Sequence, residues 1–408
     1  MQSRRISIAI MSVIPIAFLA WALTIAVPTA YETWRASEEI FQPRVDREGF
    51  ADDAPPAPTA MPESVRALLT ATAEGSAPAR SGSQIPIVGP DDESPSPTLG
   101  TITHPDVTSD DPTAIRREAT GVPAPPAATA TPLPEWNGSD PIHILLLGVD
   151  TRPSETSEGR SDTMIVVRID PVVKRVDMFS IPRDLAVNIP GFANGVKVNS
   201  AYSWGFSYGI EGGGPALVAQ TIELNFGIVI DYYATVDIPG LEHIVNTLGG
   251  VIIDVDVQLT DDQYPTEDFG YTRAYFPSGL QELDGVQAVQ YARTRHADGD
   301  FRRSERQHQL LIAIRDRFLE AGLITRLPDL IGDLRDSVRT DLTPRQVFSL
   351  ASLAQDIERE DIWIHALTPY TVVSETEQGW FLIGDWDALR WVVQNLHQDP
   401  LATNIPGS

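Results

Sequence analysis

Residues 141–400 predict an α/β layered domain. Short runs rich in Val, Ile and Leu are typical of buried β-strands, and residues 142–150 form the first of them. Segments with apolar residues at helical spacing alternate with these runs along the chain. Hydrophobic residues make up 42% of the 408-residue chain, which is enough for one sizeable core. Strands and helices that alternate around one core indicate the α/β class.

The predicted elements follow one another from residue 142 onwards. The run 142–150 ends in a Gly-containing turn, and 175–182 has the alternating pattern of a half-buried strand. Further strands are predicted at 163–170, 231–238, 251–259 and 361–367. Helical periodicity predicts helices at 215–226, 241–248, 284–293, 303–320, 328–339, 344–358 and 386–397.

An uncharged apolar stretch at residues 6–27 follows Arg4 and Arg5. A helix of roughly 22 residues is about 33 Å long, which is enough to cross the core of a bilayer. The two arginines favour a cytoplasmic location for residues 1–5. We therefore expect a single-pass anchor in the cell membrane, with the rest of the chain outside the cytoplasm. A cleaved signal peptide is the alternative, although no A-x-A site follows the stretch.

Residues 28–137 are predicted to be a low-complexity extracytoplasmic stalk. Pro, Ala, Thr, Ser and Asp dominate this segment, and such a composition cannot bury a core and is expected to stay extended or disordered. Short helices are expected within it at 31–41 and 62–74. The domain is then expected to cover residues 138–400, followed by a tail at 401–408.

The composition excludes several classes of function. The formal net charge is −26, which argues against nonspecific nucleic-acid binding because that activity needs a broad basic face. The chain contains no cysteine, so disulfides, thiolate metal sites and a cysteine nucleophile are excluded. The match of residues 205–209 to G-x-S-x-G does not predict a serine nucleophile, because no strong strand precedes it.

Arginines cluster in residues 293–306 of this acidic chain. Guanidinium groups bind phosphate bidentately and keep their charge. Arg303 and Gln307 are four residues apart on one face of a helix, near a helix start that favours anions. The pattern predicts a bound phosphate or pyrophosphate, and a solvated charged helix start is the alternative. The cluster consists of Arg293, Arg295, Arg302, Arg303 and Arg306.

Two carboxylates lie at the ends of neighbouring predicted strands. Asp150 closes the first strand and Asp162 opens the second. Mg²⁺ commonly binds one or two carboxylates together with phosphate oxygens and water, so the pair predicts a metal site. The alternative is that both residues cap turns. Arg183 and Lys197 are expected near the same edge; a salt bridge from Arg183 to Asp184 and a solvated lysine are their alternatives.

The order of these motifs resembles that of the LytR-CpsA-Psr family of envelope proteins. The resemblance covers residues 142–318 and more weakly the remainder, and it implies a central mixed β-sheet flanked by helices. Arg302 departs from the family pattern, which usually has a small residue there. The motifs are LGVDTR (147–152), GRSDTM (159–164), SIPRD (180–184), KVN (197–199), LGGV (248–251), LDGVQAVQYARTR (283–295) and DFRRSERQ (300–307).

The resemblance implies a membrane-anchored phosphotransferase that moves an anionic glycopolymer from a polyprenyl-pyrophosphate carrier to peptidoglycan. It implies Mg²⁺ or Mn²⁺ at Asp150 and Asp162, and catalytic roles for Arg183 and Arg303. Asp300 is the candidate general base, and a structural role facing an arginine is its alternative. The positions expected around the pyrophosphate are Arg160, Arg183, Lys197, Arg293, Arg295, Arg303 and Gln307.

Two other functions stay open. The older names of the family suggest an envelope-related transcriptional attenuator, although the negative charge and the absence of a helix-turn-helix pattern argue against one. A polyprenyl-pyrophosphate hydrolase or lipid-binding module would use the same residues. The family fold also implies an apolar tunnel for the polyprenyl tail, which the helices at 215–226, 241–248 and 309–318 would line unless they serve ordinary core packing.

Overall fold

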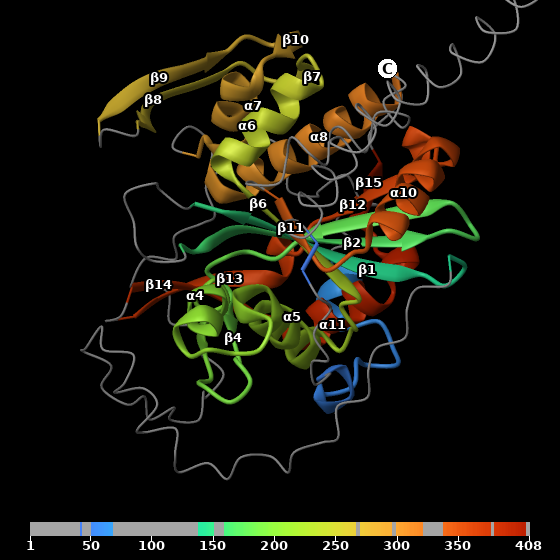
Figure 1. Cartoon of the computed structure of the whole chain (residues 1–408). Helices are drawn as coiled ribbons and strands as arrows, with labels where there is room; N and C mark the ends of the chain where they lie inside the picture. Colours follow the sequence, from blue (N-terminus) through green and yellow to red (C-terminus); the bar gives the residue numbers. More distant parts are fainter. Residues whose placement is uncertain are drawn as a thin grey trace, which may run out of the picture.

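A seven-stranded β-sheet forms the centre of the molecule, and helices cover both of its faces (Figure 1). The computed structural model describes residues 41–42, 50–67, 138–150, 159–266, 270–295, 299–320, 338–376 and 379–404. The strand order is β11-β6-β1-β2-β3-β12-β15. The strands are β1 (Ile142–Val149), β2 (Ser161–Asp170), β3 (Arg175–Ser180), β6 (Tyr232–Asp237), β11 (Val338–Thr340), β12 (Ile362–His365) and β15 (Thr403–Asn404).

The sheet is mixed. Strand β1 runs antiparallel to β2 and parallel to β6, and β12 runs parallel to β3. Parallel neighbours need crossover connections, which the helices between β3 and β6 provide. The predicted α/β class with a central mixed sheet flanked by helices is therefore confirmed.

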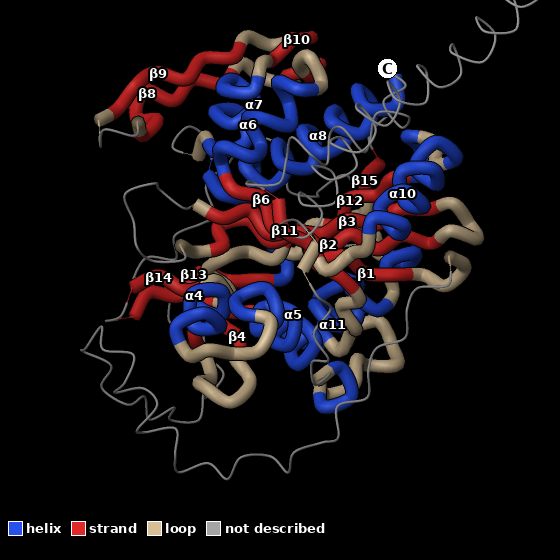
Figure 2. The backbone as a smooth tube through the Cα atoms, in the orientation of Figure 1, coloured by secondary structure: helices blue, strands red, loops and turns tan. Residues whose placement is uncertain are grey.

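Helices lie on opposite sides of the sheet (Figure 2). One face carries α6 (Ile238–Thr247), α7 (Gly285–Arg293), α8 (Gly299–Glu320) and α10 (Pro344–Leu353). The other face carries α4 (Ser200–Ser207), α5 (Gly213–Phe226) and α11 (Trp386–Gln394). Because both faces are covered, β1 is apolar along almost its whole length instead of alternating with polar residues.

The main core lies between the sheet and helices α4, α5 and α11. Leu145 and Leu147 of β1 are almost fully buried there with Leu217 and Ile222 of α5. Residues at the alternate positions of β1 point to the other face, where Ile144 packs near α10. The apolar side chains of α5 are thus core residues in the described structure, as the core-packing alternative to a lipid tunnel expects.

A smaller layer of strands lies beyond α6 and α7. The predicted single strand 251–259 is wrong, because β7 (Val251–Val255) ends before β8 (Leu259–Pro265) begins. Strand β7 pairs with β10 (Gly279–Leu283), and β8 pairs with β9 (Tyr271–Phe276). Five short elements were also not predicted. They are α4, the strand pair β4 (Ala186–Val187) and β5 (Val196–Lys197), and the hairpin of β13 (Thr371–Thr376) and β14 (Gly379–Gly384).

The helix predicted at 328–339 is wrong at its end, because Val338 and Arg339 belong to strand β11. Residues 328–337 lie outside the described residues. Strand β11 pairs antiparallel with β6 at the edge of the sheet, so backbone pairing and not helical periodicity decides its conformation.

Part of the predicted stalk packs on the domain. The short helix η1 (Ala51–Asp53) contacts α5, and Val65 is fully buried in the main core. The expectation of an extended or disordered stalk therefore does not hold for residues 50–61, whereas residues 63–67 are helical as the helix expected at 62–74 requires. Val65 is buried and Met61 is partly buried against the main core. Residues 1–40 and 68–137 lie outside the described residues, as does the predicted membrane span at 6–27. No helix in the described part is long and apolar enough to cross a membrane.

Candidate active site

Asp150 and Asp162 lie at the same end of the adjacent strands β1 and β2. The β1–β2 register shifts between Gly148 and Val149, which makes Asp162 the extra residue of a β-bulge. A bulge bends its strand and redirects the side chain of the extra residue. The backbone N–H of Asp150 donates to the carbonyl oxygen of Arg160 at 3.3 Å and keeps the two strand ends together. Local backbone geometry thus directs both carboxylates to one edge of the sheet.

Each of these carboxylates forms an ion pair with an arginine from another element. Arg293 at the end of α7 places Nη2 2.9 Å from Oδ2 of Asp150. Arg183, which follows β3, places Nη1 3.0 Å from Oδ2 of Asp162. The four side chains, which we call the rim cluster, are between 19% and 39% exposed. Partly exposed ion pairs of this kind contribute little to stability, so they can exchange partners when a ligand binds.

Asp184 connects the rim cluster to Lys197. The ammonium group of Lys197 lies 2.6 Å from Oδ1 of Asp184, while Nε of Arg183 lies 3.5 Å from Oδ2. The lysine also sits 5.4 Å above the ring of Phe381 on β14. Lys197 is therefore held beside the rim, whereas the sequence allowed a solvated side chain.

Helix α8 brings Arg303 and Gln307 against strand β2. Nη2 of Arg303 donates to the carbonyl oxygen of Asp162 at 3.3 Å, and the arginine is only 6% exposed. Nε2 of Gln307 donates to Oγ1 of Thr163 at 2.9 Å and to the carbonyl oxygen of Ala292 at 3.3 Å. Residues one helical turn apart face the same side, so both polar groups reach the strand that carries Asp162.

Gly148 allows the strands to approach closely at this point. A Cβ atom at Gly148 would lie 2.9 Å from Cβ of Thr163. Any larger residue would push Thr163 away and disturb the oxygen that accepts from Gln307. The glycine of the LGVDTR motif therefore has a packing reason within the site.

The arginines that cluster in the sequence have different roles in the structure. Arg306 is buried and donates through Nε to the carbonyl oxygen of Tyr291 at 3.0 Å, which ties α8 to α7. Arg302 pairs with Glu305 one turn along the helix, at 2.8 Å. Arg295 is exposed after the end of α7. Arg293 contacts Asp150, and Arg303 contacts the backbone of Asp162.

Two further predicted residues flank these elements. Arg160 is exposed immediately before β2. Asp300 lies in the first turn of α8, and its side chain is outside the described part of the structure.

Tyr264 on β8 contacts the rim and was not predicted from the sequence. Nη1 of Arg293 donates to the Tyr264 hydroxyl at 3.4 Å, and the guanidinium carbon lies 5.8 Å from the ring centroid. Burial raises the pKa of Tyr264, and the nearby Arg293 only partly offsets this rise. The hydroxyl therefore stays protonated at neutral pH. The sequence signal was weak because the bulged strand β8 has an irregular pattern.

The donor set at the rim suits a divalent cation with few protein ligands. Asp150 and Asp162 supply two carboxylates, and Mg²⁺ usually completes its shell with water and substrate phosphates. Among the described residues no group of three or more His, Asp or Glu is placed to hold a metal ion. The residues present thus fit a cation that arrives with a phosphorylated substrate.

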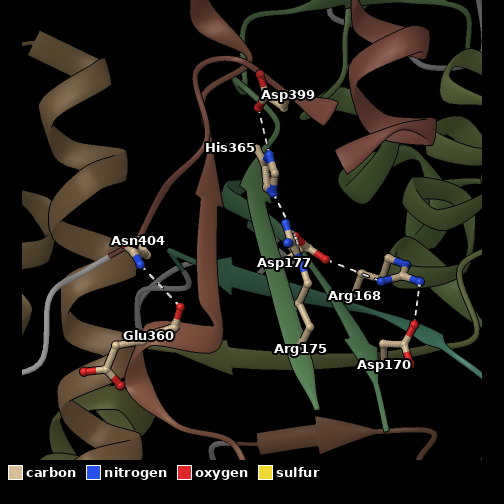
Figure 3. Close-up of polar contacts among 8 residues, drawn as sticks. All are labelled: Arg168, Asp170, Arg175, Asp177, Glu360, His365, Asp399 and Asn404. Carbon is tan, nitrogen blue, oxygen red and sulfur yellow. Dashed lines mark hydrogen bonds and ion pairs between the residues drawn. The ribbon is translucent and has the colours of Figure 1, made fainter. Parts of the chain in front are cut away.

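A second charged cluster lies inside the sheet and consists of Arg168, Arg175, Asp177, His365 and Asp399 (Figure 3). We call it the buried cluster. Nε2 of His365 lies 3.0 Å from Oδ1 of Asp177, and Nδ1 lies 2.7 Å from Oδ2 of Asp399. Both arginines also pair with Asp177, at 3.4 Å and 2.6 Å. The side chains of His365, Asp177 and Asp399 are at most 1% exposed, so no substrate can reach them.

The pKa values in the buried cluster follow from these contacts. Burial by itself lowers the pKa of His365, but hydrogen bonds to Asp177 and Asp399 outweigh it and the net pKa is raised. Burial by itself raises the pKa of Asp177, but hydrogen bonds from His365 and Arg175 outweigh it and the net pKa is lowered. These contacts favour the protonated form of His365 and the ionised form of Asp177, and the buried cluster has a structural role.

The G-x-S-x-G match has a packing explanation. Ser207 is the last residue of α4, and the preceding strand β5 is only two residues long. A Cβ atom at Gly205 would lie 2.4 Å from the carbonyl oxygen of Gly213, so the glycine allows α4 and α5 to touch. The strand–turn–helix context of a nucleophilic serine is missing, as the sequence indicated.

The sequence model of the LytR_cpsA_psr family matches residues 111–392. One similar protein is TagV of Bacillus subtilis (strain 168), which is named a polyisoprenyl-teichoic acid–peptidoglycan teichoic acid transferase. It is 37% identical to this chain over 206 residues, which are 50% of each protein. Transferase TagU of Oceanobacillus iheyensis, which has the same activity name, is 37% identical over 51% of this chain and 61% of its own. The chain thus spans about half to three fifths of the length of these relatives.

Solved structures share the fold. The crystal structure of B. subtilis TagV has a TM-score of 0.53 and 29% identity, and the match covers 64% of this chain and 98% of that one. The structure titled TagT bound to LI-WTA has a TM-score of 0.52 and 26% identity, over 65% of this chain and 94% of that one. Both matches cover about two thirds of this chain.

Proposed function

Because the chain belongs to the LytR_cpsA_psr family, we propose that it is a phosphotransferase that attaches an anionic glycopolymer from a polyprenyl-pyrophosphate carrier to peptidoglycan. The names of the relatives TagV and TagU support a glycopolymer transferase. The observation that carries the proposal is the rim cluster, in which two carboxylates and two arginines from separate elements meet beside Arg303 and Gln307.

In the proposed reaction, a hydroxyl oxygen of peptidoglycan attacks the phosphorus of the glycopolymer phosphate. The bond from that phosphorus to the bridging oxygen breaks, and the electron pair leaves with the carrier phosphate. The hydroxyl proton passes to a base, for which Asp300 in the first turn of α8 is the candidate. Phosphoryl transfer needs mainly positioning and charge neutralisation, which Arg183, Arg293 and Arg303 supply at the phosphate oxygens.

We propose that Asp150 and Asp162 hold Mg²⁺ or Mn²⁺ during this reaction. A bound cation supplies charge neutralisation for the departing carrier phosphate. Asp150 and Asp162 would hold that cation, and Arg160, Lys197, Arg295 and Gln307 would bind the pyrophosphate.

The ion pairs of Asp150 and Asp162 predict how a substitution should change metal binding. Arg183 and Arg293 neutralise the two carboxylates in the absence of ligand. Removing an arginine frees a carboxylate, so Arg183→Ala should bind Mn²⁺ alone more tightly, by roughly three- to tenfold, while it loses affinity for the pyrophosphate substrate. Electron paramagnetic resonance of free Mn²⁺ in phosphate-free buffer measures the first effect. Arg302→Ala, whose partner is Glu305, is the control, and equal Mn²⁺ affinity in all three proteins would contradict the exchange.

The transferase activity itself is tested with the full chain in detergent, a polyprenyl-pyrophosphate-linked glycopolymer and peptidoglycan fragments. Arg303→Ala should lose at least about 100-fold in rate, as expected for loss of a charge-stabilising donor. EDTA should abolish activity and Mg²⁺ should restore it. Unchanged turnover in Arg303→Ala would refute the proposed site, and metal-independent turnover would refute the role of Asp150 and Asp162.

The alternative activities differ in their products. A hydrolase would release phosphorylated polymer without any wall-linked product, which mass spectrometry distinguishes. A transcriptional attenuator would bind DNA in a salt-sensitive and sequence-specific way, which a gel shift detects. We also propose that residues 6–27 anchor the chain in the cell membrane with the domain outside, and protease protection in spheroplasts tests that orientation.

A further inference from the structure

Residues 41–42 and 50–67 attach to the domain at three separate places, and we call these two stretches the docked segment. The first place is the edge of the central sheet. Phe41 forms a parallel bridge with Thr340 of β11, and the backbone N–H of Gln42 donates to the carbonyl oxygen of Thr340 at 2.7 Å. Because β11 is the last strand on that side of the sheet, the docked segment covers part of an exposed strand edge.

The second place is the C-terminal end of α5. The backbone N–H of Phe50 donates to Oε2 of Glu223 at 3.3 Å, and Oε1 of the same side chain accepts from Ile230 at 3.0 Å. Glu223 is only 1% exposed, so its carboxylate needs hydrogen-bond donors to offset the cost of its burial. Gly227 ends α5 with a φ of 70°, and a Cβ atom there would lie 3.4 Å from Cβ of Ala54. That distance is ordinary van der Waals contact, so this end of α5 packs against the docked segment.

The third place is the main core. Val65 is fully buried among residues of the sheet and helices, and Met61 packs against the same core. The neighbouring Arg66 and Ala67 are exposed, so only one side of the turn faces inward. An apolar side chain that is removed from water in this way resists detachment. All three places lie before residue 111, where the match to the family begins.

We propose that the docked segment, and not the whole low-complexity region 28–137, sets the distance between the domain and the membrane. Only residues 28–40 separate the predicted membrane span from the first docked residue. A fully flexible chain of that length has an r.m.s. span of about 20 Å and a maximum near 45 Å, and the short helix expected at 31–41 would only reduce that maximum. A free tether of residues 28–137 would have an r.m.s. span of about 60 Å. Residues 68–137 begin and end at the same domain, so their length does not affect the distance between the domain and the membrane.

The consequence concerns access to the lipid substrate. This inference rests on the proposed membrane span and on the proposed transfer from a polyprenyl carrier. The pyrophosphate of such a carrier lies at the surface of the bilayer, within reach of a closely tethered domain. A short tether raises the effective concentration of the site at that surface. The docked segment would thereby keep the rim cluster close to its donor while leaving 68–137 free to vary in length.

Two insertions distinguish the docked segment from a free stalk. An insert of about 30 Gly/Ser residues after residue 34 lengthens the tether from roughly 20 Å to roughly 36 Å r.m.s.. The same insert after residue 100 should leave the distance unchanged. The chain has no cysteine, so Val173→Cys, at a residue 64% exposed, gives one labelling site. Energy transfer from that label to labelled headgroups in phosphatidylglycerol/phosphatidylethanolamine vesicles reports the distance.

We expect lower energy transfer only for the insert after residue 34. An equal fall for both inserts would overturn the proposal. Val65→Asp should release the docked segment, so the insert after residue 100 should then also lower energy transfer, whereas the exposed control Ala67→Asp should not have this effect.

Vesicle flotation separates the failure of this inference from failure of the transferase. A chain that does not float with vesicles overturns the spacing proposal, while transfer in detergent is measured independently. A chain that floats and shows the expected distances, but does not transfer polymer, would refute the proposed function and leave the docked segment supported.

Discussion

The rim cluster and the buried cluster contain the same kinds of ion pair in very different surroundings. Rim side chains are 19–39% exposed, and each of these ion pairs joins one carboxylate to one arginine. In the buried cluster Asp177 is 1% exposed and bonds to Arg168, Arg175 and His365. The number of partners and the access of water differ, although the residue types are alike.

This difference explains which cluster can take part in chemistry. Exchange of an ion pair for a substrate contact costs little where water already solvates the charges. Exchange in a buried network would leave an uncompensated charge in a medium of low dielectric, which costs several kcal/mol. The rim charges are therefore suited to the binding role proposed for them, whereas the buried charges stabilise the fold.

The largest expected effect is on the stability of the buried cluster. Asp177→Ala removes the common partner of His365 and two arginines, and it should lower the free energy of unfolding by about 3–5 kcal/mol. Urea unfolding followed by tryptophan fluorescence measures the change. The control is Asp262→Ala, which breaks an ion pair with Arg273 whose side chains are 66–67% exposed, and it should cost less than about 1 kcal/mol. A similar loss of unfolding free energy in both variants would show that burial does not determine how much an ion pair contributes to stability.

The corresponding change at the rim should affect activity and not stability. Asp162→Ala should reduce the transfer rate by about 10²- to 10³-fold, because it removes a group that holds the reacting phosphates. Its free energy of unfolding should change by less than about 1 kcal/mol, since the pair with Arg183 is partly exposed. Rate assays and urea unfolding on the same preparations check both statements. A large loss of stability with an intact rate would reverse the roles assigned to the two clusters.

Two buried histidines should give opposite pH dependence. The pKa of His365 is raised above its unfolded value of 6.5, so its stabilising contribution is present below about pH 6.5 and is lost as pH rises through the folded pKa. Burial lowers the pKa of His308 to about 4, so that residue destabilises the fold as pH falls from about 6.5 to 4.

The variant His365→Gln separates these effects. The difference in unfolding free energy between wild type and His365→Gln should be larger near pH 6 than near pH 10, because only the protonated imidazole attracts Asp177 and Asp399. Denaturant titrations at both pH values measure it. A constant difference would mean that the histidine acts through packing alone.

The smallest expected effect is at Arg302, where the chain departs from the family pattern. Its guanidinium pairs with Glu305 on the same helix, so Arg302→Ala should change the unfolding free energy by at most about 0.5 kcal/mol. The transfer rate should change by less than about twofold, as a rate assay can show. A larger loss of transfer rate would mean that Arg302 takes part in the reaction together with the rim cluster.

Much of the fold follows from local sequence. The apolar runs that became β1, β2 and β3 and the periodic segments that became α5 and α7 are recognisable because their neighbours in sequence determine them. The residues of the site were recognisable for the same reason, since Asp150, Asp162 and Arg303 belong to short ordered motifs. The family's sequence pattern covers 111–392 and carries the same information.

Other features needed contacts between distant parts of the chain. His365 and Asp177 are 188 residues apart, and neither lies in a recognisable motif. The five clustered arginines look equivalent in sequence, yet Arg306 is buried between α7 and α8 whereas Arg303 reaches the strand of Asp162. Strands β8 and β9 form an irregular pair whose pattern is not periodic.

The sequence by itself determined the layered α/β class, the acidic character and the identity of the phosphate-binding residue types, because these depend on composition and local periodicity. Tertiary structure alone decided the bulge that directs Asp162 and the exchangeable pairs with Arg183 and Arg293. It also decided that Val65 is buried within a segment whose composition predicts an extended chain. Burial is a property of what packs against a residue, and the packing partners of Val65 come from distant parts of the sequence.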